Sequence, residues 1–193
     1  MGVNLLTALL IMILLLPFSL KAKPLETVDH VDLSRYLGKW YEIARMPQFF
    51  QRKCARDVIA EYKLDESSIF VTNSCTTDRG EVLVAEGHAR VVDSLSNAKL
   101  EVTFVKLFGW RYAFGGDYWI IDLASDYRYA VIGHPNRKYA WVLSRNPELP
   151  AADLSVIEKR LRENGYDTCT LNMTVQTGGF SSKTPLCKSV MAR

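Results

Sequence analysis

The stretch Gly38-Lys39-Trp40-Tyr41-Glu42-Ile43-Ala44-Arg45 decides the fold of this chain. Its side chains alternate with a period of two, as in a β-strand, so that Trp40, Glu42 and Ala44 share one face. The glycine fits a tight turn before the strand, and a small residue follows the tryptophan on its own face. This arrangement predicts a strand whose tryptophan plugs one end of a barrel and leaves space beyond it.

Further alternating segments follow at the spacing of antiparallel hairpins. After residues 39–45, the predicted strands cover residues 58–64, 69–73, 86–91, 100–104, 118–123, 129–133 and 139–145. Leu154, Ile157 and Leu161 then recur at helical spacing and predict a helix that packs on the barrel's outside. A short last strand is predicted at residues 170–176. The fold class is therefore all-β, an eight-stranded antiparallel up-and-down barrel with one C-terminal α-helix.

Three blocks of this sequence resemble the lipocalin family, in the branch of bacterial lipocalins, plant temperature-induced lipocalins and apolipoprotein D. They are Gly38-Lys39-Trp40, the turn Ser125-Asp126-Tyr127 in place of Thr-Asp-Tyr, and the strand that ends at Arg145. Residues 116–121 and 141–147 point to this branch, and the resemblance covers residues 31–177. It implies that the Arg145 guanidinium stacks on Trp40 and closes the barrel's narrow end, a cation–π contact of roughly 0.5–2 kcal/mol.

Residues 1–22 are predicted to be a signal peptide, and residues 23–193 the mature lipocalin domain. The apolar run from Leu5 to Leu16 is broken only by Thr7 and is too short to span a bilayer. Bacterial members of this branch are often acylated on a cysteine just after the signal. The first cysteine here is Cys54, so we expect an exported protein, periplasmic or secreted, without a lipid anchor on an N-terminal cysteine.

The four cysteines are an even count, which in an exported chain favours two disulfides. Cys54 and Cys75 lie almost symmetrically about the predicted turn at residues 65–68, which slightly favours Cys54–Cys75 with Cys169–Cys187. The family resemblance instead implies a bond from Cys54 to the C-terminal tail, which would leave Cys75 with Cys169. Both pairings stay open at this point. No pair has C-x-x-C spacing, so no metal site is expected.

Small residues on the predicted inner face indicate a cavity, because an eight-stranded barrel has room for side chains or for one small ligand. The predicted ligand-binding residues are Glu42, Ala44, Val58, Ala60, Tyr62, Ala89, Val102, Phe104 and Trp141. An alkyl chain buried there would gain about 0.8 kcal/mol per CH₂. A filled, rigid core is the alternative. For Glu42 a structural role as a hydrogen-bond acceptor is favoured over contact with a ligand.

Aromatic residues gather in two connections that the barrel topology places at the same end. They are Phe49 and Phe50 after the first strand, and Phe108 and Trp110 between the fifth and sixth. We expect these rings to form the rim of the open mouth, beside basic residues suited to phosphate headgroups or carboxylates. Because exposed aromatic clusters often mark contact surfaces, we also expect transient contact of this rim with a membrane surface. A lid packed over the barrel is the alternative.

The search for catalytic motifs is negative, and the three histidines lie on separate predicted elements. A net charge of +3 is too small to indicate nucleic acid binding. The sequence therefore predicts a binding protein without cofactor, not an enzyme, and a monomer or weak homodimer. It would hold a fatty acid, a lysophospholipid or a similar ligand for lipid transport or storage in envelope or membrane maintenance. The alternatives are a lipocalin-fold enzyme acting on a hydrophobic ligand, and a protein that binds a partner protein through the barrel mouth.

Overall fold

The computed structural model describes residues 23–65 and 68–191. The predicted signal peptide, residues 1–22, therefore lies outside the described residues. None of the helices in the described part is long and apolar enough to cross a membrane.

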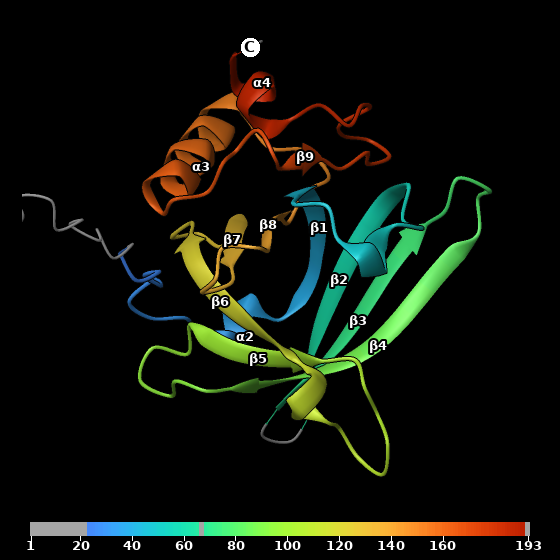
Figure 1. The fold of residues 1–193 in the computed structure, drawn as a ribbon, viewed down its shortest axis with the longest axis vertical. Helices are drawn as coiled ribbons and strands as arrows, with labels where there is room; N and C mark the ends of the chain where they lie inside the picture. Colours follow the sequence, from blue (N-terminus) through green and yellow to red (C-terminus); the bar gives the residue numbers. More distant parts are fainter. Residues whose placement is uncertain (1–22, 66–67, 192–193) are drawn as a thin grey trace, which may run out of the picture.

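The described strands form one antiparallel sheet that closes into a barrel, because β1 pairs with both β2 and β8. This arrangement confirms the fold class predicted from the sequence, and Figure 1 shows the strands wrapped around a common interior. The strands are β1 (Gly38–Arg45), β2 (Arg56–Asp65), β3 (Ser68–Thr76), β4 (Val82–Val91), β5 (Lys99–Thr103), β6 (Gly116–Leu123), β7 (Tyr129–Gly133), β8 (Ala140–Ser144) and β9 (Asn172–Met173). The short β9 pairs with the end of β1.

Helical segments lie at the ends and on the outside of this barrel. They are α2 (Leu33–Tyr36), η1 (Phe49–Gln51), η2 (Tyr112–Phe114), α3 (Ala151–Glu163) and α4 (Leu186–Met191). The predicted apolar stripe of Leu154, Ile157 and Leu161 is fully buried on α3. Figure 1 shows α3 and α4 together on one side of the strands.

The barrel wall separates two apolar cores. On β7, Ala130 and Ile132 point into the barrel, whereas Val131 between them packs outward beneath α3. Every residue of β7 is buried, because this part of the wall is covered on both faces. The inner core fills the closed end of the barrel, and the outer core attaches the C-terminal region.

A β-bulge in β1 changes which residues face the interior. Glu42 pairs with Leu143 of the inner core, but Ala44 pairs with Val142 of the outer core. The prediction that Ala44 lines the cavity is therefore wrong, since one extra residue shifts the alternation by one position. The same shift turns Arg45 to the face of Glu42.

The connection between β5 and β6 does not lie at the mouth. It forms a tight hairpin in which Phe108 (φ 49°) and Gly109 (φ 107°) make the turn, and Lys106 pairs with Trp110 across it. The Trp110 ring stacks on His88 with 5.2 Å between ring centroids. His88 pairs with Phe70 and lies on the outer face of β4.

The prediction that Phe108 and Trp110 rim the mouth is therefore wrong. In Figure 1 this connection lies at the bottom of the view, whereas η1, drawn in cyan, lies higher up beside β2. The physical reason is the shortness of β5, which pairs only with residues 88–91 of β4. The chain consequently leaves the wall at the level of His88, where the outer face offers aromatic partners.

Candidate functional site

The narrow end of the barrel is closed by Trp40 and Arg145, as predicted. Trp40 is fully buried, and its indole nitrogen donates to the Tyr36 carbonyl at 2.8 Å. The Arg145 guanidinium carbon lies 3.8 Å from the centroid of the indole ring. Arg145 also donates to the carbonyls of Lys39 and Arg35 at 2.8 and 2.6 Å. These bonds hold the plug formed by α2 against the first strand.

The turn at residues 125–127 secures the same plug from the other side. Arg35 of α2 lies over the Tyr127 ring at 4.0 Å and donates to the Ser125 carbonyl at 3.0 Å. The Tyr127 hydroxyl accepts the backbone N–H of Asp32 at 2.9 Å. The three sequence blocks that resemble the family therefore meet at one end of the barrel, where their role is structural.

Three tyrosine hydroxyls form a hydrogen-bonded chain inside the barrel, near its closed end. The Tyr118 hydroxyl lies 2.7 Å from that of Tyr36 and 2.9 Å from that of Tyr62. Burial raises the pKa of Tyr62 to about 12 and holds the pKa of the other two well above the usual 10.0. Tyr62 was predicted for the interior. Tyr36 and Tyr118 were not, although Tyr118 shares the alternation of the inward Ile120 and pairs with the inward Leu100.

These raised pKa values predict a loss of stability in alkaline solution. The folded barrel keeps the phenols of Tyr36, Tyr62 and Tyr118 protonated at a pH where the unfolded chain ionises them. Stability is therefore complete below about pH 10 and falls as the pH rises toward about 12. A titration followed by phenolate absorbance should show these three of the nine tyrosines ionising only with unfolding. If all nine ionised before the far-ultraviolet circular dichroism changed, the hydroxyl chain would not be buried.

Most of the predicted lining residues lie on the inner face. Ala89 pairs with Ile69 on one side and Val102 on the other, which gives a row of inward side chains across three strands. The Phe104 ring covers Gly87, where an added Cβ would come within 2.7 Å of it. Besides Glu42 at the mouth, the inward set that the structure shares with the sequence prediction is Ala60, Tyr62, Ala89, Val102, Phe104 and Trp141.

The upper part of this inner face is accessible, unlike the packed floor. Phe104 is 45 % exposed, and Ala60, Val102 and Trp141 are partly exposed. Ala85 is exposed although it pairs with the inward Asn73. Within the described residues, the segment of β4 before His88 pairs with β3 alone. The wall is therefore open along this edge, and the upper interior keeps apolar side chains in reach of solvent.

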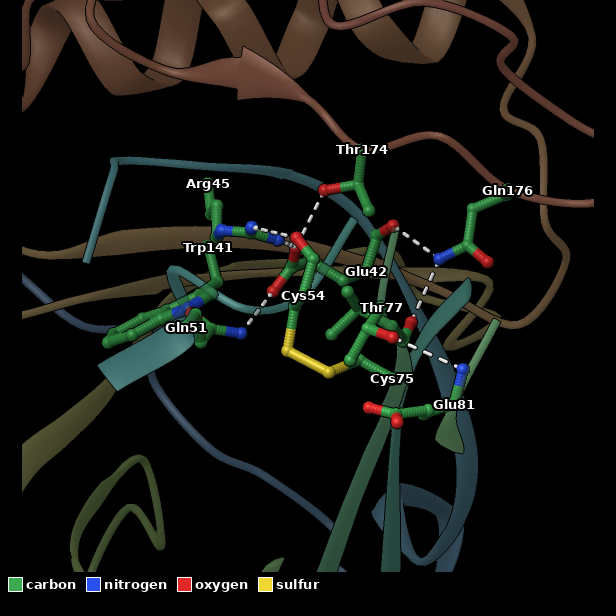
Figure 2. The surroundings of a disulfide bond; sticks show 11 residues. Glu42, Arg45, Gln51, Cys54, Cys75, Thr77, Glu81, Trp141, Thr174 and Gln176 are labelled. Carbon is green, nitrogen blue, oxygen red and sulfur yellow. Dashed lines mark hydrogen bonds and ion pairs between the residues drawn. A yellow bond between two sulfur atoms is a disulfide. The ribbon is translucent and has the colours of Figure 1, made fainter. Parts of the chain in front are cut away.

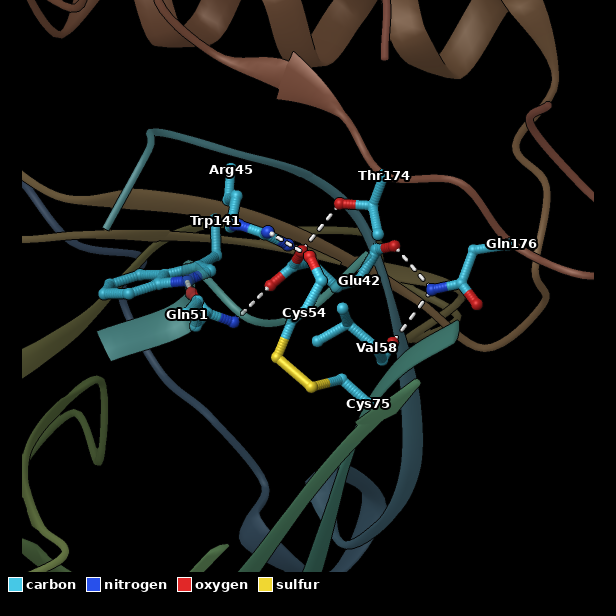
Figure 3. A network of polar contacts seen from close by, with 9 residues as sticks. All are labelled: Glu42, Arg45, Gln51, Cys54, Val58, Cys75, Trp141, Thr174 and Gln176. Atoms are coloured by element: carbon cyan, nitrogen blue, oxygen red, sulfur yellow. Dashed lines mark hydrogen bonds and ion pairs between the residues drawn. A yellow bond between two sulfur atoms is a disulfide. The ribbon is translucent and has the colours of Figure 1, made fainter. Parts of the chain in front are cut away.

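At the mouth, Glu42 belongs to a network that engages both of its carboxylate oxygens (Figure 3). One oxygen accepts from Arg45 and, at 2.6 Å, from the Thr174 hydroxyl. The other accepts from the Gln51 side chain at 3.0 Å. Gln176 donates to the backbone carbonyls of Glu42 and Val58, both at 2.8 Å. Glu42 is thus a buried structural acceptor that ties the C-terminal segment and η1 to the barrel.

The mouth network also reaches residues of the inner wall, namely Trp141 and Val58. The Trp141 indole nitrogen donates to the Gln51 side-chain oxygen at 3.2 Å, which places η1 beside the inward Trp141. Figure 3 also shows Val58 below Glu42, beside the disulfide. The exposed rings of Phe49 and Phe50 lie next to each other on η1, 5.2 Å apart.

The disulfides are Cys54–Cys75 and Cys169–Cys187. This is the pairing slightly favoured by the position of the cysteines, and the alternative implied by the family resemblance is not formed. The first bond joins the end of the η1 connection to β3 (Figure 2). Arg45 donates to the Cys54 carbonyl at 3.3 Å, so the bond and the Glu42 network support the same loop.

Among the described residues, His88 and His134 lie in different parts of the barrel and do not form a common catalytic or metal site. His88 is buried on the outer wall, where Nδ1 lies 2.7 Å from the Tyr112 hydroxyl and Nε2 3.2 Å from Asp65. His134 lies 3.6 Å from Asp117 in a separate turn. Among the described residues, no group of three metal-ligating side chains comes together.

Comparison with known proteins agrees with this geometry. The family model of the lipocalin-like domain matches residues 31–176. Temperature-induced lipocalin-1 of Arabidopsis thaliana is 37% identical over 158 residues, covering 80% of this chain and 84% of that protein. The outer membrane lipoprotein Blc of Vibrio cholerae is 36% identical over 146 residues, covering 74% and 81% of the two chains. Apolipoprotein D of Macaca fascicularis is 32% identical over 157 residues, covering 77% and 78%.

Among solved structures, insecticyanin from the tobacco hornworm Manduca sexta superposes with a TM-score of 0.65 at 24% identity. That alignment covers 86% of this chain and 95% of insecticyanin, and it shows the same fold. With the barrel, the closing tryptophan and arginine, and the match over residues 31–176, this chain belongs to the lipocalin family.

Proposed function

We propose that this protein binds a long-chain fatty acid, a lysophospholipid or a similar lipid inside the barrel. The observation that carries the proposal is the contrast between a packed floor and an accessible apolar wall. Trp40 is fully buried, whereas its strand partner Ala60 is partly exposed, and so are Val102 and Phe104. Apolar surface left open to water on the inside of a barrel is stabilised when an alkyl chain covers it. Lipocalin membership supports binding of a small hydrophobic ligand.

The acyl chain would lie inside with its polar end toward the mouth. Arg45 is the one basic side chain on the inner face of the described strands, and Glu42 pairs with it. The exposed basic residues Arg52 and Lys53 follow Phe49 and Phe50 at the mouth. These side chains suit transient contact of η1 with a membrane surface, from which the ligand would enter. Lipid transport or storage in membrane maintenance is the role that this arrangement favours.

Affinity should rise with chain length until the interior is full. Each added methylene contributes about 0.8 kcal/mol, or roughly a fourfold lower Kd. A series of saturated fatty acids and their lysophospholipids, titrated against tryptophan fluorescence, measures this slope. Trp141 should report binding, because its ring is partly exposed on the inner wall, and Trp141→Phe should remove most of the signal. A Kd independent of chain length would contradict the proposal.

We further propose that the protein is a binder without catalytic activity. All four cysteines are in disulfides, which leaves a thiol nucleophile without support. Both carboxylate oxygens of Glu42 are engaged by the protein itself, and this occupation argues against an acid–base role. Partner-protein binding at the mouth is the second candidate, favoured by the exposed Phe49 and Phe50. It would replace lipid binding if the fatty acid series gave no saturable signal.

Export from the cytoplasm is part of the proposal, and the two disulfides support it. The mature chain should begin near Lys23 and carry no covalent lipid, because the first cysteine, Cys54, is bonded to Cys75. The relative named an outer membrane lipoprotein would differ from this chain in that respect. Intact mass spectrometry of the purified protein tests both points, and an acyl group at the amino terminus would overturn the second.

A further inference from the structure

We propose that the barrel interior contains a hydroxyl-recognition site, formed by Asn73 and the tyrosine chain Tyr36–Tyr118–Tyr62. This site would select acyl chains that carry a hydroxyl group toward their far end over the unsubstituted chains. The inference rests on the proposed function, because it names the class of lipid that the same interior prefers.

Asn73 is a polar residue in an otherwise apolar part of the wall. It lies on the inner face of β3, two positions after the inward Val71, and it pairs with Ala60 on one side and Ala85 on the other. Its amide oxygen is buried without a hydrogen-bond partner among the described residues. Because an unpaired buried polar atom is unfavourable, this oxygen accepts a hydrogen bond from a molecule inside the barrel, either a water or the hydroxyl group of a ligand that displaces it.

The tyrosine chain offers the complementary group. Three hydroxyls have three protons, but the chain contains only two hydrogen bonds, at 2.7 and 2.9 Å. Whichever way the bonds run, one hydroxyl proton of the chain has no acceptor among the described residues. Phenols are protonated at neutral pH, and burial raises the pKa of these three still further. Tyr118 remains partly exposed on the inner face, so the chain is within reach of a ligand.

Asn73 and the tyrosine chain lie at neighbouring levels of the interior. Tyr62 pairs with Val71, and Asn73 is the next inward residue of β3, about 7 Å further toward the mouth. The two groups therefore meet an acyl chain at successive levels: a hydroxyl on the chain donates to the amide oxygen at one level, or accepts from the tyrosine chain at the next. The far end of an acyl chain would reach this level after passing the accessible wall at Val102 and Phe104.

The chemistry of the site favours a hydroxyl group over a carboxylate. The only basic side chain on the inner face of the described strands, Arg45, is paired with Glu42 at the mouth. An ionised carboxylate at the level of Asn73 would be desolvated without a counter-charge, and it has no proton to donate to an amide oxygen. A hydroxyl both donates and accepts, so it satisfies an asparagine amide in either orientation.

The experiment compares hexadecanoate with its ω-hydroxy counterpart by calorimetry, on the parent protein and on Asn73→Leu. The parent should bind the ω-hydroxy acid about tenfold more tightly than hexadecanoate, as one hydrogen bond to a buried polar group allows. Asn73→Leu should reverse this preference and keep its affinity for hexadecanoate within about threefold. Thr72→Val changes a neighbour on the outer face of β3 and should behave like the parent.

A second variant and a stability measurement keep the outcomes separate. Tyr118→Phe should weaken the preference for the ω-hydroxy acid, which shows that the tyrosine chain takes part. Asn73→Leu should not lower the melting temperature of the empty protein, since no hydrogen bond of its amide oxygen is lost. If the parent preferred hexadecanoate as strongly as Asn73→Leu does, the hydroxyl site would be wrong and lipid binding would stand. If the parent bound neither acid, the proposed function itself would fail.

Discussion

Replacement of Trp40 by alanine should lower the free energy of unfolding by about 3–5 kcal/mol, the cost of deleting a large buried aromatic side chain. The indole is fully buried, packs against the Tyr36 ring at 5.0 Å between centroids and has the Arg145 guanidinium carbon 3.8 Å from its own centroid. Its loss would leave a cavity at the closed end and would remove the aromatic ring on which the Arg145 guanidinium stacks. Urea unfolding measures the change, and the melting temperature should fall by roughly 10 °C.

Trp119→Ala is the matched control, because Trp119 is partly exposed on β6 and contacts Lys99 at 4.8 Å. It should cost clearly less than Trp40→Ala. Arg145→Ala should also lower the melting temperature, but by less, since its backbone partners can bind water instead. Equal effects of the two tryptophan substitutions would show that Trp40 does not close the barrel.

Replacement of Ala60 by phenylalanine should abolish the binding of long-chain fatty acids, with a Kd raised about thirtyfold or more. Ala60 lies on the inner face of β2 beside Asn73 and is partly exposed, so that a larger side chain has room to enter the interior. The added ring would occupy the path of the acyl chain. The expected cost in stability is about 1–3 kcal/mol.

Ala89, the other small residue predicted for this role, is a poorer choice. It is only 1% exposed, so a phenylalanine there would strain the packed floor before it blocked a ligand. Val84→Phe provides the control, because Val84 lies on the outer face of β4 and is 61% exposed. If Ala60→Phe bound fatty acids as the parent and Val84→Phe do, the ligand would lie outside the barrel.

Glu42 at the mouth shows how much of the candidate site could be predicted from the sequence. Alternation placed Glu42 on the inner face, and the sequence left open whether it served a ligand or the fold. The hydroxyl of Thr174 and the amide of Gln51 decided in favour of the fold. These partners come from segments 132 and 9 residues away, and a pairing over such a separation leaves no periodic signal.

Asn73 and Tyr118 were not predicted as site residues, although each lies on a strand that the sequence located correctly. What the sequence did not reveal is their hydrogen-bond status. The amide oxygen of Asn73 is left without a partner because its strand neighbours on either side are alanines. Tyr118 reaches Tyr36 and Tyr62 because the closing of the barrel brings α2, β2 and β6 together around one interior.

The sequence by itself determined the barrel, the closing pair of Trp40 and Arg145, and the apolar stripe of α3. These features follow from local alternation and from residue types whose burial is strongly favoured at a given face. Only the tertiary structure decided that Ala44 faces outward and that the hairpin with Trp110 lies on the outer wall. The first depends on a single-residue bulge against β8, which inverts every face beyond it. The second depends on the partners that a short β5 brings within reach, and neither is encoded in the period of the chain.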